Sequence, residues 1–173
     1  MRSSMYVFLD VSIVLIVLFM LQKYKWSTLD PLRQIVHKLF FIYCLSVIVL
    51  TIFPVSSMIP QLFYKPLFSM NMNAFSDVFK GYGNYYQQIA LNIILFIPFG
   101  LLLPMIKKLK GYQVILLGFS FSLMIELIQP LLLFSRVSDV TDIITNTTGA
   151  LLGYLLYLSF KPLLRKIAKA QGE

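Results

Sequence analysis

Five long apolar stretches dominate this chain of 173 residues. Each has 18 to 23 mostly apolar residues, the length that an α-helix needs to cross the hydrocarbon core of a bilayer. The predicted spans are residues 5–22, 39–59, 89–106, 112–134 and 142–160. Because 58% of the residues are hydrophobic and only 13% are charged, the chain has too little polar surface for a water-soluble globule. The sequence therefore predicts an all-α, polytopic membrane helix bundle that forms a single domain over residues 1–173.

The basic residues between the apolar stretches predict the orientation of the bundle. Eleven of the fifteen lysines and arginines lie in the segments that follow the first, third and fifth spans, which share one side of the membrane. Cytoplasmic segments of membrane proteins carry such an excess of positive charge. We therefore expect the N-terminus outside the cell, the C-terminus in the cytoplasm, and a basic cytoplasmic tail over residues 161–173. Contact with anionic lipid head groups explains this charge, and no nucleic acid is expected, because no basic groove-reading element is visible.

Three further expectations concern the ends and connections of the spans. The second span is expected to finish near Phe53, because prolines and serines follow it closely. Residues 60–88 contain eight aromatic residues, which predicts a loop at the outer head-group level that either anchors the bundle or covers a site. Residues 161–169 place basic side chains around apolar ones and predict a short interfacial helix.

The fourth span carries polar residues, whose burial in a membrane costs free energy and therefore calls for an explanation. Glu126 and Gln129 lie within the span, and Arg136 follows its outer end. The three share one helix face if the helix continues to Arg136. Pro130 has no amide proton, so the carbonyl oxygen of Glu126 should lose its helical donor and the helix should kink there.

The fifth span shows a stripe with spacings of three and four residues, formed by Asp139, Asp142, Asn146, Gly149 and Gly153. Gly149 and Gly153 form a small-xxx-small motif, which lets another helix approach closely. Gly100 in the third span is a further expected packing position. The first three residues of the stripe, two carboxylates and an amide, should face a polar environment.

Nearly all of these polar groups fall toward the outer side in the predicted topology. The sequence therefore predicts one polar pocket open to the outside, with these binding candidates: Asn92, Glu126, Gln129, Arg136, Asp139, Asp142 and Asn146. A purely structural reading, in which the groups satisfy one another, stays open. Asp10 lies in the outer half of the first span, and we expect it to reach the interface. The sequence around His37 and Cys44 does not indicate a zinc site or an activated thiol.

These residues resemble the signatures of a known family. Residues 92–104, from Asn92 through Gly100 to Pro104, are similar to the first signature of the VanZ-like family of teicoplanin-resistance membrane proteins. Residues 126–129 and 136–154 resemble its second and third signatures, and residues 71–75 a short preceding stretch. Two positions depart from the pattern: Ala74, where a proline is often found, and Ser135, where a glycine is common. The resemblance covers about residues 35–160.

The resemblance implies a multi-pass protein of the bacterial plasma membrane with a link to glycopeptide resistance, but no settled reaction. Three functions stay open. The first is binding of a lipid-linked envelope precursor or a glycopeptide. The second is an intramembrane enzyme that modifies an envelope lipid, either with Glu126 and Asp142 as general acid and base or with a divalent cation on carboxylates. The third is a scaffold or transporter subunit.

Overall fold

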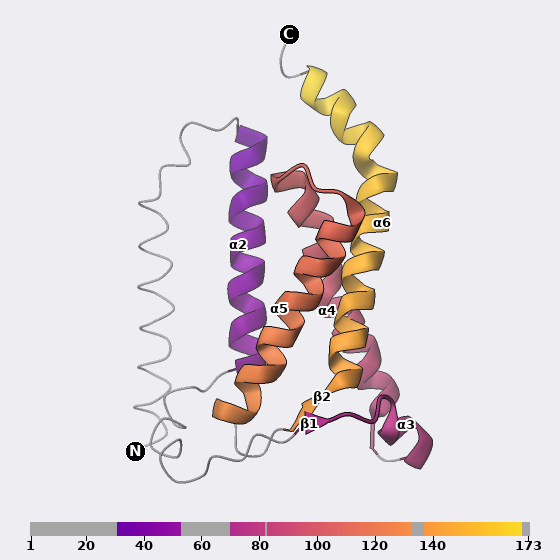
Figure 1. Cartoon of the computed structure of the whole chain (residues 1–173). Helices are drawn as coiled ribbons and strands as arrows, with labels where there is room; N and C mark the ends of the chain where they lie inside the picture. The colour runs from indigo at the N-terminus through magenta and orange to yellow at the C-terminus, as the bar shows by residue number, and fades with distance from the viewer. Residues whose placement is uncertain (1–30, 53–69, 82, 133–136, 171–173) are drawn as a thin grey trace. The chain divides into compact units, whose positions relative to one another are not determined.

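The computed structural model describes residues 31–52, 70–81, 83–132 and 137–170, which are mostly α-helical (Figure 1). The elements in chain order are α2 (Pro31–Ile52), β1 (Met70–Asn71), α3 (Ser76–Lys80), α4 (Tyr85–Ile106), α5 (Gly111–Leu132), β2 (Ser138–Asp139) and α6 (Val140–Ala170). The predicted first span at residues 5–22, together with Asp10, lies outside the described residues.

Four of the described helices are long and apolar enough to cross a membrane, namely α2, α4, α5 and α6. They correspond to the second to fifth predicted spans, which indicates a membrane protein. The boundaries of α4 and α5 lie within a few residues of the predicted ones. The outward N-terminus and cytoplasmic C-terminus stay predictions.

Two helices extend beyond the apolar stretches that predicted them. α2 begins at Pro31 rather than at residue 39, because proline is well suited to the first helical position and the polar residues that follow do not end a helix. α6 continues to Ala170, so residues 161–169 are not a separate helix. The segment is rich in leucine, lysine, arginine and alanine, which favour helix, and Pro162 is accommodated within it.

Residues 70–88, expected to form a loop, contain β1, α3 and the first residues of α4. β1 pairs in parallel with β2, with Met70 opposite Ser138 and Asn71 opposite Asp139. Strands of two residues carry no readable periodicity, so the sequence alone predicted only helices.

The chain divides into two compact units. Unit 1 comprises Met1–Ala74 and Leu123–Val140, and unit 2 comprises Phe75–Ser122 and Thr141–Glu173. The described part of unit 1 holds α2, the β1–β2 pair and the C-terminal part of α5. Unit 2 holds α3, α4, the N-terminal part of α5 and nearly all of α6. The single membrane domain expected from the sequence stays a prediction.

In unit 2, α4 and α6 touch backbone to backbone. A Cβ atom built on Gly149 would lie 2.2 Å from the carbonyl oxygen of Ile93, and one on Gly153 would lie 2.0 Å from that of Ile97. Because both contacts advance in the same direction along the two helices, α4 and α6 run parallel. Gly100 faces α6 in the same way, since its Cβ would lie 1.9 Å from the carbonyl oxygen of Ala150. Only glycine permits this approach.

Aromatic rings fill the core of unit 2 beside this contact. Phe96 is fully buried, and its ring centroid lies 6.0 Å from that of Phe99 and 5.8 Å from that of Phe121. The rings of Phe99 and Phe121 stack with centroids 5.5 Å apart. The phenylalanines join α4 to α5, and the glycines join α4 to α6.

We expect Gly153→Ala to destabilise the protein in detergent by about 1–3 kcal/mol, because its new methyl group would meet backbone that cannot move aside easily. Gly149→Ala should act alike. The control is Leu152→Ala on the same helix, whose side chain is 41% exposed and should matter much less. Thermal unfolding measures all three, and an equal loss for Gly153→Ala and Leu152→Ala would contradict the packing argument.

Candidate functional site

The polar residues of unit 1 form a group that we call the Glu126 cluster, made of Asn71, Glu126, Ser138 and Asp139. Glu126 is only 2% exposed, and Ser138 is fully buried. α5 supplies Glu126, and the paired strands β1 and β2 supply the other three residues. The cluster therefore joins segments far apart in the chain.

Pro130 explains how α5 meets β2. A proline within a helix cannot donate to the carbonyl four residues earlier, which here belongs to Glu126. The Ser138 hydroxyl donates a hydrogen bond to that carbonyl oxygen. A buried serine thus replaces the missing helical donor, as a polar group at membrane depth requires.

The carboxylate of Glu126 also binds β2. The backbone N–H of Asp139 donates to Oε2 of Glu126 over 2.9 Å. The Asp139 carboxylate in turn accepts a hydrogen bond from the side-chain amide of Asn71 over 3.1 Å. Oδ1 of Asn71 accepts the backbone N–H of Asn73 over 3.1 Å. The amide of Asn71 therefore orders the turn after β1 and holds the side chain of Asp139.

Unit 2 contains a second polar group, the Asn146 cluster, made of Asn92, Ser122, Asp142 and Asn146. The side-chain amide of Asn92 on α4 donates to Oδ1 of Asp142 over 2.7 Å. One turn further along α6, the amide of Asn146 donates to the Ser122 hydroxyl on α5 over 2.9 Å. Asp142 and Asn146 of the α6 stripe are thus hydrogen-bonded to α4 and α5, respectively.

Asn146 differs from the other members of its cluster. Its side chain is 5% exposed, and Ser122 is fully buried. Its Oδ1 atom is buried and has no hydrogen-bond partner within the described part of the chain. A buried carbonyl oxygen without a donor costs about 1–3 kcal/mol, and such an atom calls for an explanation.

Near the start of α6, Thr141 holds the backbone of Phe75. The N–H of Phe75 donates to Oγ1 of Thr141 over 2.9 Å. Phe75 has a φ of +58°, in the left-handed region that a bulky residue rarely adopts. This hydrogen bond therefore fixes the conformation of Phe75 in the segment between β1 and α3.

The structure does not bring the seven predicted binding residues into one group. Glu126 and Asp139 lie in the Glu126 cluster, and Asn92, Asp142 and Asn146 lie in the Asn146 cluster. Gln129 is 5% exposed and donates to the backbone oxygen of Thr51 over 3.0 Å, so it caps the last turn of α2. Arg136 lies outside the described residues.

Three residues enter the clusters that sequence reasoning did not select: Asn71, Ser122 and Ser138. Asn71 belongs to a stretch that resembles a family signature. Pro130 indicated that the carbonyl oxygen of Glu126 needs another donor, but not that Ser138 supplies it. Ser122 gave no signal, because a serine in a span more often bonds its own helix.

The clusters present carboxylate and amide groups in largely satisfied hydrogen bonds. Among the described residues, no three histidine, cysteine, aspartate or glutamate side chains gather in a way that could hold a metal ion. The polar groups of the two clusters include two carboxylates and an amide in unit 1, and a carboxylate and two amides in unit 2.

A known family model covers the residues of both clusters. The profile of the VanZ/LLP1 family matches residues 40–163. Protein VanZ from Enterococcus faecium is 36% identical over 119 residues, which are 67% of this chain and 69% of that protein. No solved structure shows a significant match. The chain therefore belongs to the VanZ/LLP1 family.

Proposed function

We propose that this protein lies in the plasma membrane of a bacterium and binds a lipid-linked envelope molecule or a glycopeptide, thereby lowering susceptibility to teicoplanin. The buried Oδ1 atom of Asn146, which has no hydrogen-bond partner among the described residues, carries this proposal. A hydrogen-bond donor of the bound molecule would satisfy that oxygen, and family membership supports the link to the envelope.

The charged residues of each unit would take roles of their own. Asp142 is held by Asn92 and would attract a cationic or hydrogen-bond-donating group of the ligand. Arg136, whose position lies outside the described residues, would hold a carboxylate or phosphate through paired N–H groups. Glu126 and Asp139 would set the local negative charge at the end of α5.

Replacing both members of the Asn146–Ser122 pair separates a binding role from a structural one. The double variant Ser122→Ala, Asn146→Leu removes the amide and the hydroxyl together, so neither is left buried without the other. We expect normal abundance in the membrane and a loss of teicoplanin resistance. The measurement is drug susceptibility of a host that lacks the native gene, with membrane abundance determined alongside.

Thr148→Ala serves as the control, because Thr148 is exposed on the same helix and its hydroxyl donates to the backbone oxygen of Ile144 in that helix. It should leave resistance unchanged. Full resistance of the double variant at normal abundance would show that the pair only holds helices together.

Glu126→Gln tests whether charge at the Glu126 cluster matters. A glutamine oxygen can still accept the N–H of Asp139, so the fold should survive while the ionisable group is lost. We expect a drop in resistance at normal abundance. Glu126→Ala also leaves the backbone N–H of Asp139 without its acceptor and should in addition lower the abundance of the protein in the membrane. If the host with Glu126→Gln is as resistant to teicoplanin as the host with the parent protein, the carboxylate charge has no functional role.

The proposed topology places the β1–α3 region outside the cell. In a Cys44→Ala background, Met72→Cys should react with an impermeant thiol reagent on intact cells, since Met72 is 71% exposed. Lys108→Cys, between α4 and α5, should react only after the membrane is permeabilised. The reverse pattern would place the polar clusters toward the cytoplasm and remove the proposed route to an external drug.

A further inference from the structure

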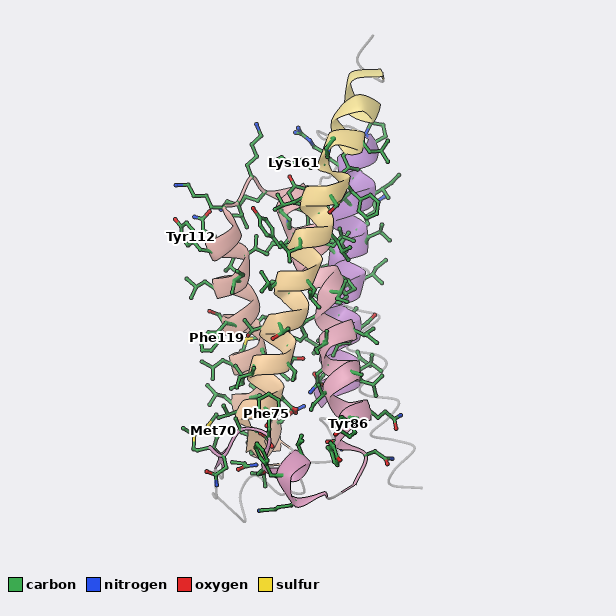
Figure 2. All side chains as sticks on the ribbon, turned by 90° about the vertical axis from the view of Figure 1, so that its right-hand side faces the viewer. Met70, Phe75, Tyr86, Tyr112, Phe119 and Lys161 are labelled. Carbon is green, nitrogen blue, oxygen red and sulfur yellow. The ribbon has the colours of Figure 1, made fainter. Side chains whose placement is uncertain are left out.

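Four lysines gather at one end of unit 2, away from the Asn146 cluster. Lys107, Lys108 and Lys110 are exposed in the connection between α4 and α5, and Lys161 lies on α6. Figure 2 shows Tyr112 and Lys161 toward one end of the unit, and Phe75 and Tyr86 toward the other. We call this lysine-bearing end the basic surface.

A glycine fixes the connection against α6. A Cβ atom on Gly111 would lie 2.8 Å from the ring of Tyr154, so the start of α5 rests directly on that ring. The ring of Tyr157 lies 6.1 Å from that of Tyr154, and Nζ of Lys161 lies 5.8 Å from the centre of the Tyr157 ring. Tyrosine rings therefore link the lysines of the connection to the lysine on α6.

The sequence around the basic surface contains no acid that could neutralise it. Residues 85–122 and 143–170 include neither aspartate nor glutamate. The positive charge therefore needs anions from elsewhere. An exposed lysine offers a compact positive charge, which suits a phosphate oxygen.

The depth of the basic surface identifies the source of the anion. One candidate membrane span ends at Ile106, the next begins at Gly111, and the last ends at Leu164. The four lysines therefore lie within a few residues of span ends. This is the level of lipid head groups, where tyrosine rings also prefer to sit. A head-group phosphate is present at that level at high local concentration, unlike a free anion in solution.

We propose that the basic surface binds the head-group phosphate of an anionic phospholipid, with Lys110 and Lys161 as its main contacts and the tyrosine rings positioning Lys161. This interaction is independent of the proposed envelope ligand, because none of its residues belongs to the Asn146 cluster. Its role would be to seat this end of the helices in the charged leaflet.

The test uses the purified full-length protein in detergent, with phosphatidylglycerol or phosphatidylcholine of identical acyl chains added. We expect phosphatidylglycerol to raise the melting temperature more than phosphatidylcholine does, and native mass spectrometry to show it bound. Lys110→Gln with Lys161→Gln should weaken that binding by about fivefold per lysine, given the usual strength of a lysine near anionic lipid. Lys65→Gln with Lys80→Gln removes the same charge from the segment that is expected on the opposite side of the membrane and should change little.

Three results would overturn the proposal. Equal effects of the two lipids on the parent protein would exclude recognition of the anionic head group. Equal losses in the two double variants would show a response to net charge alone. Competition by millimolar inorganic phosphate would assign the surface to a free anion. If the double variant is poorly expressed, Lys110→Gln alone gives the same comparison, because Lys110 is exposed and its side chain is not needed for packing.

Discussion

The direct contact between the backbones of α4 and α6 determines much of unit 2. Gly149 and Gly153 lie against the carbonyl oxygens of Ile93 and Ile97, and this sets both the separation and the register of the two helices. In that register, Asn92 reaches Asp142 over 2.7 Å. A side chain at either glycine would push the helices apart and lengthen this hydrogen bond. Packing at the glycines and polar pairing at the start of α6 are therefore one arrangement.

The Glu126 cluster follows from a different constraint, the need of every backbone group at membrane depth for a partner. Pro130 removes the helical donor for the carbonyl oxygen of Glu126, and the Ser138 hydroxyl replaces it. The pairing of β2 with β1 then brings Asn71 to the carboxylate of Asp139. One proline in α5 thus explains why the buried Ser138 lies against the backbone of Glu126.

The charged residues of α6 are arranged in the direction that stabilises a helix dipole. Asp142 lies in the first turn, where the helix dipole is positive, and the lysines and arginine lie toward the other end. The acid and the amides are engaged in hydrogen bonds, whereas the basic surface has no acid nearby in the sequence. These two ends support different proposals, a bound envelope molecule at one and a lipid head group at the other.

The sequence by itself determined the membrane class, the positions of four described helices and the polar stripe on α6, because all of these depend on local composition and on the helical period. The spacing of Gly149 and Gly153 indicated a close helix neighbour, and the free carbonyl of Glu126 followed from Pro130. Only the tertiary structure decided that α4 is that neighbour and that Ser138 is the donor. It also decided that Asn146 bonds Ser122, and that Gln129 caps α2. These pairings join residues up to 78 positions apart, and helical periodicity says which face a side chain occupies but not which helix lies opposite.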